Sequence, residues 1–114
     1  YKLQIKYRDP ITCGNYQKLK EMSDKKKIKL VCVQYPMRNI EPLKMMFKPE
    51  NRDGIVFVDN EKIFNEALQK GSYKEYFIDM FAGDFGHCTG KGYGLLAKNV
   101  ANIILKECFR RQAE

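Results

Sequence analysis

The sequence has only one histidine, His87, and its four cysteines include no CxxC pair. Because structural zinc sites usually need closely spaced cysteine pairs, this spacing argues against a zinc ribbon. It also does not match the cystine framework of a small secreted domain, which favours a reducing compartment such as the cytoplasm. No apolar run approaches the roughly 20 residues of a membrane-spanning helix, so we expect no membrane span.

The N-terminus carries no signal-peptide pattern, and Tyr1 is not an initiator methionine. We therefore expect a truncated or processed chain, and the missing signal says nothing about where the whole protein is located. The 114 residues are enough for one domain or for part of one, with a modest core.

The net charge of +7 comes from 21 basic and 14 acidic residues. An excess of this size can attract polyanions. The basic residues are, however, spread along the chain and interrupted by acidic ones, and no aromatic-basic ribonucleoprotein signature accompanies them. We predict a lysine-rich solvated surface with no sequence-specific nucleic-acid partner.

Apolar runs and helical patterns alternate along the chain. The nearly continuous apolar runs Ile28 to Gln34 and Ile55 to Val58 predict buried strands, and Tyr35-Pro36 should end the first of them. A weaker alternation at Leu3 to Tyr7 indicates an edge strand or a helix end, and Asp9-Pro10 indicates a turn. Helices are expected at Asn15 to Lys27, Asn39 to Met46, Glu61 to Lys70 and Lys91 to Arg110.

Capping residues and apolar stripes indicate where these helices begin and end and which side chains face inward. Asn15 and Thr89 are candidate caps, and Gly71 should stop the third helix. Residues expected to face inward are Tyr16, Leu19 and Met22; Ile63, Phe64, Ala67 and Leu68; and Leu96, Val100, Ile103, Ile104 and Cys108. Cys32, within an apolar run, should be a small core residue.

The element order predicts an α/β protein in which a parallel sheet is covered on both faces. A complete doubly wound sheet usually has about five or six strands, and only two are certain here. We therefore expect part of a three-layer α/β/α sandwich.

The stretch from Asp79 to Tyr93 is rich in glycine and contains His87, with Asp84 three residues before it. A carboxylate at this spacing in a turn can fold back to the imidazole, fix its tautomer and stabilise the imidazolium. A loop that leads into a helix can present such a pair to a reacting group. By spacing alone, an ordinary surface histidine is the commoner interpretation, and an Asp-x-x-His pair also occurs by chance in many proteins.

Asp84-Phe85-Gly86-His87 is followed by Thr89, Gly92 and Leu95-Leu96-Ala97. This block resembles the last conserved block of GDSL/SGNH-type serine hydrolases, which precedes the C-terminal helix. Upstream, Ile28 to Pro36 and Gly54 to Asn60 are similar to two strands of that family. The likeness in element order spans roughly Asn15 to Lys106.

The resemblance implies a flavodoxin-like α/β/α sandwich and an esterase or lipase-like hydrolase that needs no cofactor. It also implies that His87 is the catalytic base, that Asp84 orients it, and that the substrate is a small-molecule, carbohydrate or lipid ester. The family's Gly-Asp-Ser and Gly-x-Asn-Asp blocks are absent, and neither Ser23 nor Ser72 stands in such a block. We therefore expect residues 1–114 to be the C-terminal part of one hydrolase domain, inactive without the N-terminal part that holds the nucleophilic serine.

Other interpretations compete with this one. Cys88 could be a thiol nucleophile, and the glycines from Gly83 to Gly94 could form a phosphate-binding loop, although they fit neither common phosphate motif. Asp79, Asp84, His87 and Cys88 could ligate a metal, although their spacing is not a recognised one. The aromatic residues Tyr73, Tyr76, Phe77 and Phe81 could pack together or line an acyl pocket. The alternative function is a non-catalytic α/β binding module with a basic surface.

Overall fold

The computed structural model describes residues 9–81, 83 and 85–110 of the chain. These residues belong to two compact units, one formed by Tyr1–Cys32 with Asn39–Phe57 and the other by Val33–Arg38 with Val58–Glu114. The pattern at Leu3 to Tyr7 and the residue Asp84 lie outside the described residues.

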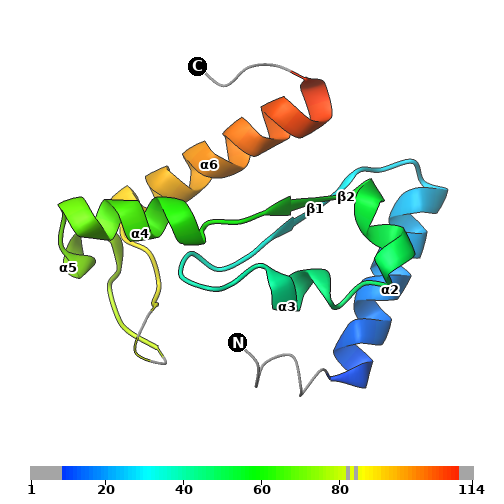
Figure 1. Cartoon of the computed structure of the whole chain (residues 1–114), viewed down its shortest axis with the longest axis horizontal. Coiled ribbons are helices and arrows are strands. Elements are labelled where there is room, and N and C mark those ends of the chain that lie inside the picture. Colours follow the sequence, from blue (N-terminus) through cyan, green and yellow to red (C-terminus); the bar gives the residue numbers. More distant parts are fainter. Residues whose placement is uncertain (1–8, 82, 84, 111–114) are drawn as a thin grey trace. The chain divides into compact units, whose positions relative to one another are not determined.

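Two parallel strands, β1 (Leu30–Val33) and β2 (Ile55–Val58), form the sheet (Figure 1). Both consist mainly of β-branched and other apolar residues, which suit a buried pleated surface. Their positions and parallel pairing confirm the predicted mixed α/β class, although β1 is shorter than expected. The three-layer sandwich stays a prediction, since the described residues contain two paired strands.

The first unit contains α2 (Pro10–Lys25), α3 (Glu41–Lys44) and the 3₁₀ helix η1 (Pro49–Gly54). Its core is a cluster of Cys32, Phe47 and Ile55, against which half-buried residues of these elements pack. Cys32 is therefore a core residue, as its apolar surroundings in the sequence predict.

The prediction that α2 begins at Asn15 is wrong, and so is the turn predicted at Asp9-Pro10. The side chain of Asp9 accepts hydrogen bonds from the backbone N–H groups of Ile11 and Thr12, so Asp9 caps the helix. Pro10 then occupies the first helical position, where its fixed φ is favourable and its missing N–H costs nothing. The same dipeptide that indicates a turn thus also begins a helix.

The predicted inner face of α2 is also wrong in part. Tyr16 packs edge-on against Phe47, with ring centroids 5.4 Å apart. Leu19 and Met22, however, are 44% and 57% exposed, whereas Lys20 and Ser23 are buried. The buried face therefore follows Tyr16 by four and seven residues, which is helical spacing.

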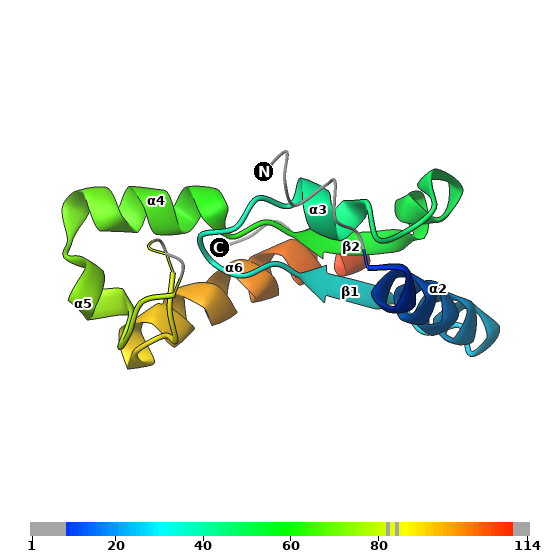
Figure 2. The same cartoon turned by 90° about the horizontal axis from the view of Figure 1, so that it is seen from below.

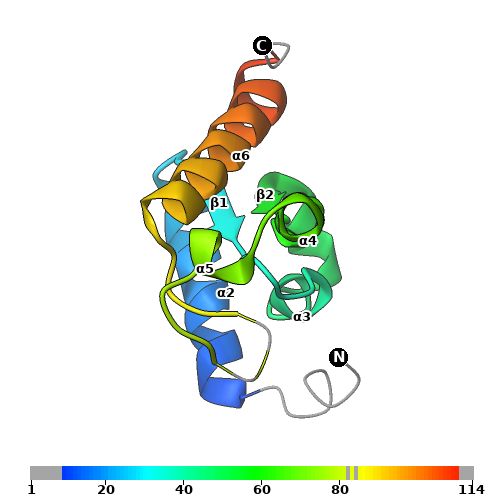
Figure 3. The same ribbon diagram turned by 90° about the vertical axis from the view of Figure 1, so that its left-hand side faces the viewer.

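The second unit contains α4 (Glu61–Lys70), α5 (Tyr73–Tyr76) and α6 (Gly90–Phe109) (Figure 3). The bounds of α4, its end at Gly71 and the cap of α6 by Thr89 agree with the sequence predictions. Helix α6 contacts both α4 and α5. The core of this unit is a buried cluster of Phe64, Tyr76, Phe77 and Cys88.

The apolar stripe of α6 is less buried than the sequence predicts. Leu96 packs against the core cluster, as expected. The rest of the predicted stripe is half-buried, at Val100, Ile103, Ile104 and Cys108. None of the described helices combines the length and apolar character that crossing a bilayer requires.

Asn60 ties together the segments that follow the two strands. It is fully buried, its amide donates to the carbonyl of Gln34 at 2.8 Å, and its Oδ1 accepts from the amide of Asn99 at 2.7 Å. The backbone N–H of Gln34 in turn donates to the carbonyl of Val58. Buried polar groups need such partners, so Asn60 fixes the carboxyl ends of the strands against α6.

Candidate active site

The candidate site lies on the connection between α5 and α6, residues 77–88, which we call the His87 loop (Figure 2). Antiparallel bridges pair Phe77 with Cys88 and Phe81 with Phe85. Between them, the backbone N–H of Ile78 donates to the carbonyl of His87 at 2.8 Å. The chain thus runs out and returns alongside itself, so residues distant in sequence become neighbours.

Two glycines make this loop possible. Gly83 has a φ of 81°, in the left-handed region where glycine is strongly favoured. Gly86 lies against Asp79, and a Cβ at Gly86 would collide with the backbone carbonyl of Asp79. Close approach of the two sides of the loop therefore requires a residue without a side chain. A structural role therefore accounts for these two glycines.

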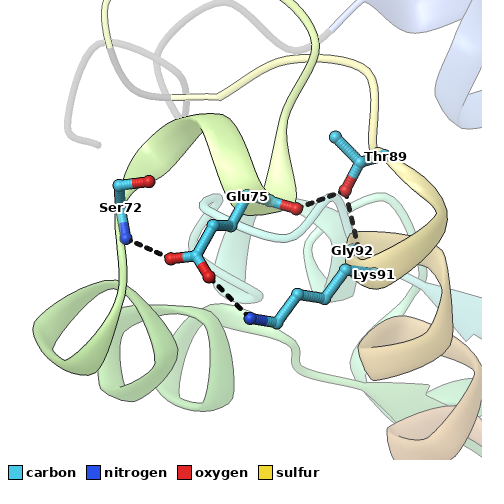
Figure 4. Close-up of polar contacts among 5 residues, drawn as sticks. All are labelled: Ser72, Glu75, Thr89, Lys91 and Gly92. Atoms are coloured by element: carbon cyan, nitrogen blue, oxygen red, sulfur yellow. Dashed lines mark hydrogen bonds and ion pairs between the residues drawn. The ribbon is translucent and has the colours of Figure 1, made fainter.

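A polar network ties α5 to the start of α6 and so closes the base of the loop (Figure 4). The Glu75 carboxylate accepts from the backbone N–H of Ser72 at 2.6 Å and from Lys91 Nζ at 2.8 Å. The Thr89 hydroxyl donates to the backbone carbonyl of Glu75 and accepts from the N–H of Gly92. The Lys91 ammonium, with the Ser72 N–H, lowers the pKa of Glu75, and Glu75 in turn raises the pKa of Lys91.

His87 lies on the returning side of the loop, and its side chain is 65% exposed. Its Nδ1 is 2.7 Å from Oδ2 of Asp79, and its backbone N–H donates to Oδ1 of the same carboxylate at 2.7 Å. The ring stands edge-on to Phe81, with centroids 5.1 Å apart. Hydrogen bonds from the His87 side chain and backbone lower the pKa of Asp79, so this carboxyl is ionised at neutral pH.

The loop reaches the segment that follows β1. The ring of Phe85 lies 5.4 Å from that of Tyr35, and the guanidinium of Arg38 lies 4.5 Å above the Phe85 ring. The loop therefore approaches the carboxyl end of β1, and open α/β sheets usually place their sites at the carboxyl ends of strands. An open, mainly apolar pocket of about 170 Å³ adjoins the same segment, lined by Val33, Gln34, Tyr35, Pro36 and Leu96.

The aromatic residues of this region divide between the two roles considered for them. Tyr76 and Phe77 are buried in the core cluster, and Tyr73 stacks on Phe77 at 4.8 Å. Phe81 is instead 47% exposed and lies beside His87. The packing interpretation therefore applies to the first three, and only Phe81 is placed to touch a ligand.

The sequence singles out His87 but gives no spacing signal for its contact with Asp79. The predicted partner, Asp84, lies outside the described residues, so that pairing stays a prediction, and the described carboxylate on the imidazole is that of Asp79. Asp79 precedes His87 by eight residues, and they meet only because Phe77 pairs with Cys88. A search restricted to a three-residue spacing cannot find such a partner, whereas the aromatic residues flanking the glycines indicate that the stretch can pair with itself.

The competing chemistries have less support. Cys88 is buried in the core cluster, and burial raises the pKa of its thiol, which disfavours the thiolate that a nucleophile requires. Across the described part of the chain, no three potential metal-ligating side chains of the histidine, cysteine and acidic types gather at one point.

Comparison with known proteins gives no match to a protein-family model, to a curated protein or to a solved structure. We therefore infer function from the geometry of the His87 loop and from the residues that resemble the SGNH block.

Proposed function

We propose that this chain supplies the general-base half of an SGNH-type ester hydrolase, with His87 as the base. The observation that carries the proposal is an exposed imidazole held at Nδ1 by a carboxylate, with Nε2 unoccupied by any described residue. A general base needs such an arrangement, because one ring nitrogen must be oriented while the other reaches the reacting group.

In the proposed reaction, Nε2 of His87 accepts the proton of a serine hydroxyl located outside this chain. The serine oxygen attacks the ester carbonyl, and the imidazolium returns the proton to the departing alcohol. A water molecule then loses a proton to Nε2 and attacks the acyl carbonyl. The bond between this carbon and the serine oxygen breaks, the imidazolium returns the proton to that oxygen, and the carboxylic acid leaves. The resemblance assigns the orienting role to Asp84, which lies outside the described residues, whereas the described carboxylate at Nδ1 is that of Asp79. The oxyanion donors also lie outside this chain.

The substrate class is an ester with a small or apolar acyl group. Phe81 beside the imidazole and the open apolar pocket next to Tyr35 support this choice, because both offer contacts to hydrocarbon and few to charge. Acetylated carbohydrates, lipids and other small esters all belong to this class.

The test is hydrolysis of a chromogenic short-chain ester by a longer polypeptide that includes the expected N-terminal blocks. His87→Ala should lower kcat by about 10²- to 10⁴-fold, the usual contribution of a general base. On this proposal the 114-residue chain alone should show no turnover, because the nucleophile and the oxyanion donors belong to the N-terminal blocks.

Lys62→Ala provides a matched control, because the Lys62 side chain is 87% exposed on α4 and belongs to no part of the proposed machinery. It should leave kcat unchanged. Equal activity in the longer polypeptide and its His87→Ala variant would remove His87 from the reaction. Activity in the isolated chain would place the nucleophile within residues 1–114, and Cys88→Ala would then be the next variant.

A further inference from the structure

We propose that Asp79 is the positioning residue that holds His87 in its Nδ1–H tautomer and leaves Nε2 as the proton acceptor. The consequence for catalysis rests on the function proposed above. The tautomer itself can be measured without any turnover, so the two proposals can fail separately.

Asp79 contacts His87 with both of its carboxylate oxygens. Oδ2 lies 2.7 Å from the ring Nδ1, and Oδ1 accepts the backbone N–H of the same residue at 2.7 Å. An ionised carboxylate can only accept hydrogen bonds, so Nδ1 must carry the hydrogen. In the neutral ring, the lone pair then lies on Nε2.

The remaining groups of His87 are also held. Its backbone carbonyl accepts from the N–H of Ile78, and its ring is packed edge-on to Phe81. Three of its four polar groups therefore have hydrogen-bond partners, and Nε2 is the one with no hydrogen bond to any described residue. This is the arrangement that directs one nitrogen toward a ligand.

Asp79 is itself anchored. Its backbone carbonyl accepts a hydrogen bond from the hydroxyl of Tyr73 at 2.5 Å. Tyr73 belongs to α5 and stacks on the buried ring of Phe77. On the other side, Gly86 lets the backbone approach Asp79 closely. The carboxylate is thus fixed by a helix and by the loop before any substrate arrives, which is the kind of support that precise sites require.

Two aspartates compete for the same role. The three-residue spacing assigns it to Asp84, whereas the geometry assigns it to Asp79. Only one carboxylate can occupy Nδ1, so the two assignments predict different behaviour for matched Asp→Asn variants.

The experiment is a long-range ¹H–¹⁵N spectrum of the 114-residue chain, which distinguishes a protonated from an unprotonated ring nitrogen. His87 is the only histidine, so its ring signals need no separation from others. The spectrum is recorded at about pH 9, where an ordinary imidazole is neutral. Wild-type chain should show a protonated Nδ1 and an unprotonated Nε2.

Asp79→Asn should reverse this tautomer. The introduced amide has one oxygen, which the His87 backbone N–H occupies, so its NH₂ group faces Nδ1 and favours a ring protonated at Nε2. Asp84→Asn is the matched control, with the same chemical change on the same loop. It should keep the wild-type tautomer.

A wild-type ring protonated mainly at Nε2, or a reversal in Asp84→Asn but not in Asp79→Asn, would overturn the proposal. The wild-type spectrum alone shows which ring nitrogen is protonated, so the proposal can be rejected even if Asp79→Asn fails to fold. In the longer polypeptide, Asp79→Asn should lower kcat about 10²-fold or more and change KM little, since Nε2 would no longer accept a proton. Full ester turnover by His87→Ala would reject the hydrolase function and leave the tautomer assignment untouched.

Discussion

At the scale of single residues, the His87 loop shows how a polar side chain can be oriented while it remains exposed. The carboxylate of Asp79 is not buried, so its contact with His87 depends on geometry more than on low dielectric. Both of its oxygens are satisfied by one residue. Such a double contact resists rotation of the imidazole better than a single hydrogen bond would.

The titration of Asp79 gives a prediction at this scale. His87→Ala removes the side-chain hydrogen bond, so the pKa of Asp79 should rise toward its ordinary value, although only in part because the backbone N–H of residue 87 remains. Carboxyl ¹³C NMR across the acid range measures this. Asp9 is the internal control, because Thr12 and Ile11 lower its pKa without any contribution from His87. A change at Asp9, or none at Asp79, would contradict the assignment.

The sign of the pH effect follows from the same contact. A carboxyl whose pKa is lower in the folded chain stabilises that chain at pH values above its unfolded pKa, about 3.9. The contribution disappears as the pH falls through the lower, folded value of Asp79. The stabilisation from this contact is therefore lost only in acid, and the effect on global stability should be small because both groups are exposed.

At the scale of elements, the contact between α5 and the start of α6 fixes both ends of the His87 loop. Gly92 is buried there, and a Cβ at this position would collide with the backbone carbonyl of Tyr76 and lie 3.0 Å from Cβ of Cys88. Glycine is therefore needed within this helix, even though it weakens helices elsewhere. The glycine of the SGNH-like block thus has a packing role in this chain.

Matched glycine variants test this point. Gly92→Ala should destabilise the chain by about 1–3 kcal/mol through overpacking. Gly94→Ala should instead stabilise it by roughly 0.5–1 kcal/mol, because no atom lies within 4 Å of the added methyl group and alanine favours the helix. Urea unfolding of both variants measures the two changes. If both variants changed the free energy of unfolding in the same direction, α6 would not approach α5 as closely as the structure indicates.

How much could be predicted from the sequence depends on how local each signal is. The observed bounds of helix α4 match the predicted bounds to the residue, because the 3.6-residue apolar period and the stop at Gly71 are local features of the sequence. The start of α2 was missed because Asp9-Pro10 serves equally in a turn and in a helix cap. The chemistry of its side chain singles out His87 in the sequence, whereas its contact with Asp79 cannot be predicted there because it depends on backbone pairing across the loop.

At the scale of the whole molecule, charge is the property most open to misinterpretation. The chain carries a net charge of +7, yet several lysines are paired with acidic neighbours within the two units. These pairs join Lys20 to Asp24, Lys44 to Glu41, Lys62 to Glu66 and Lys91 to Glu75. Local pairing reduces the electrostatic field that a polyanion meets. The surface should therefore attract polyanions weakly and without specificity, and should not recognise particular bases.

The prediction for nucleic acid follows from this diffuse charge. Binding to duplex DNA should be weak and equal for unrelated sequences, because only phosphates are contacted. With about three phosphate contacts, affinity should fall roughly 40-fold between about 50 and 200 mM salt, since each contact releases counterions. Fluorescence anisotropy of two unrelated duplexes, with heparin as a polyanion without bases, measures both properties. A preference of about tenfold or more for one duplex, or tight binding that persists at physiological salt, would instead support the binding module, because base contacts would then have to supply affinity that diffuse charge cannot.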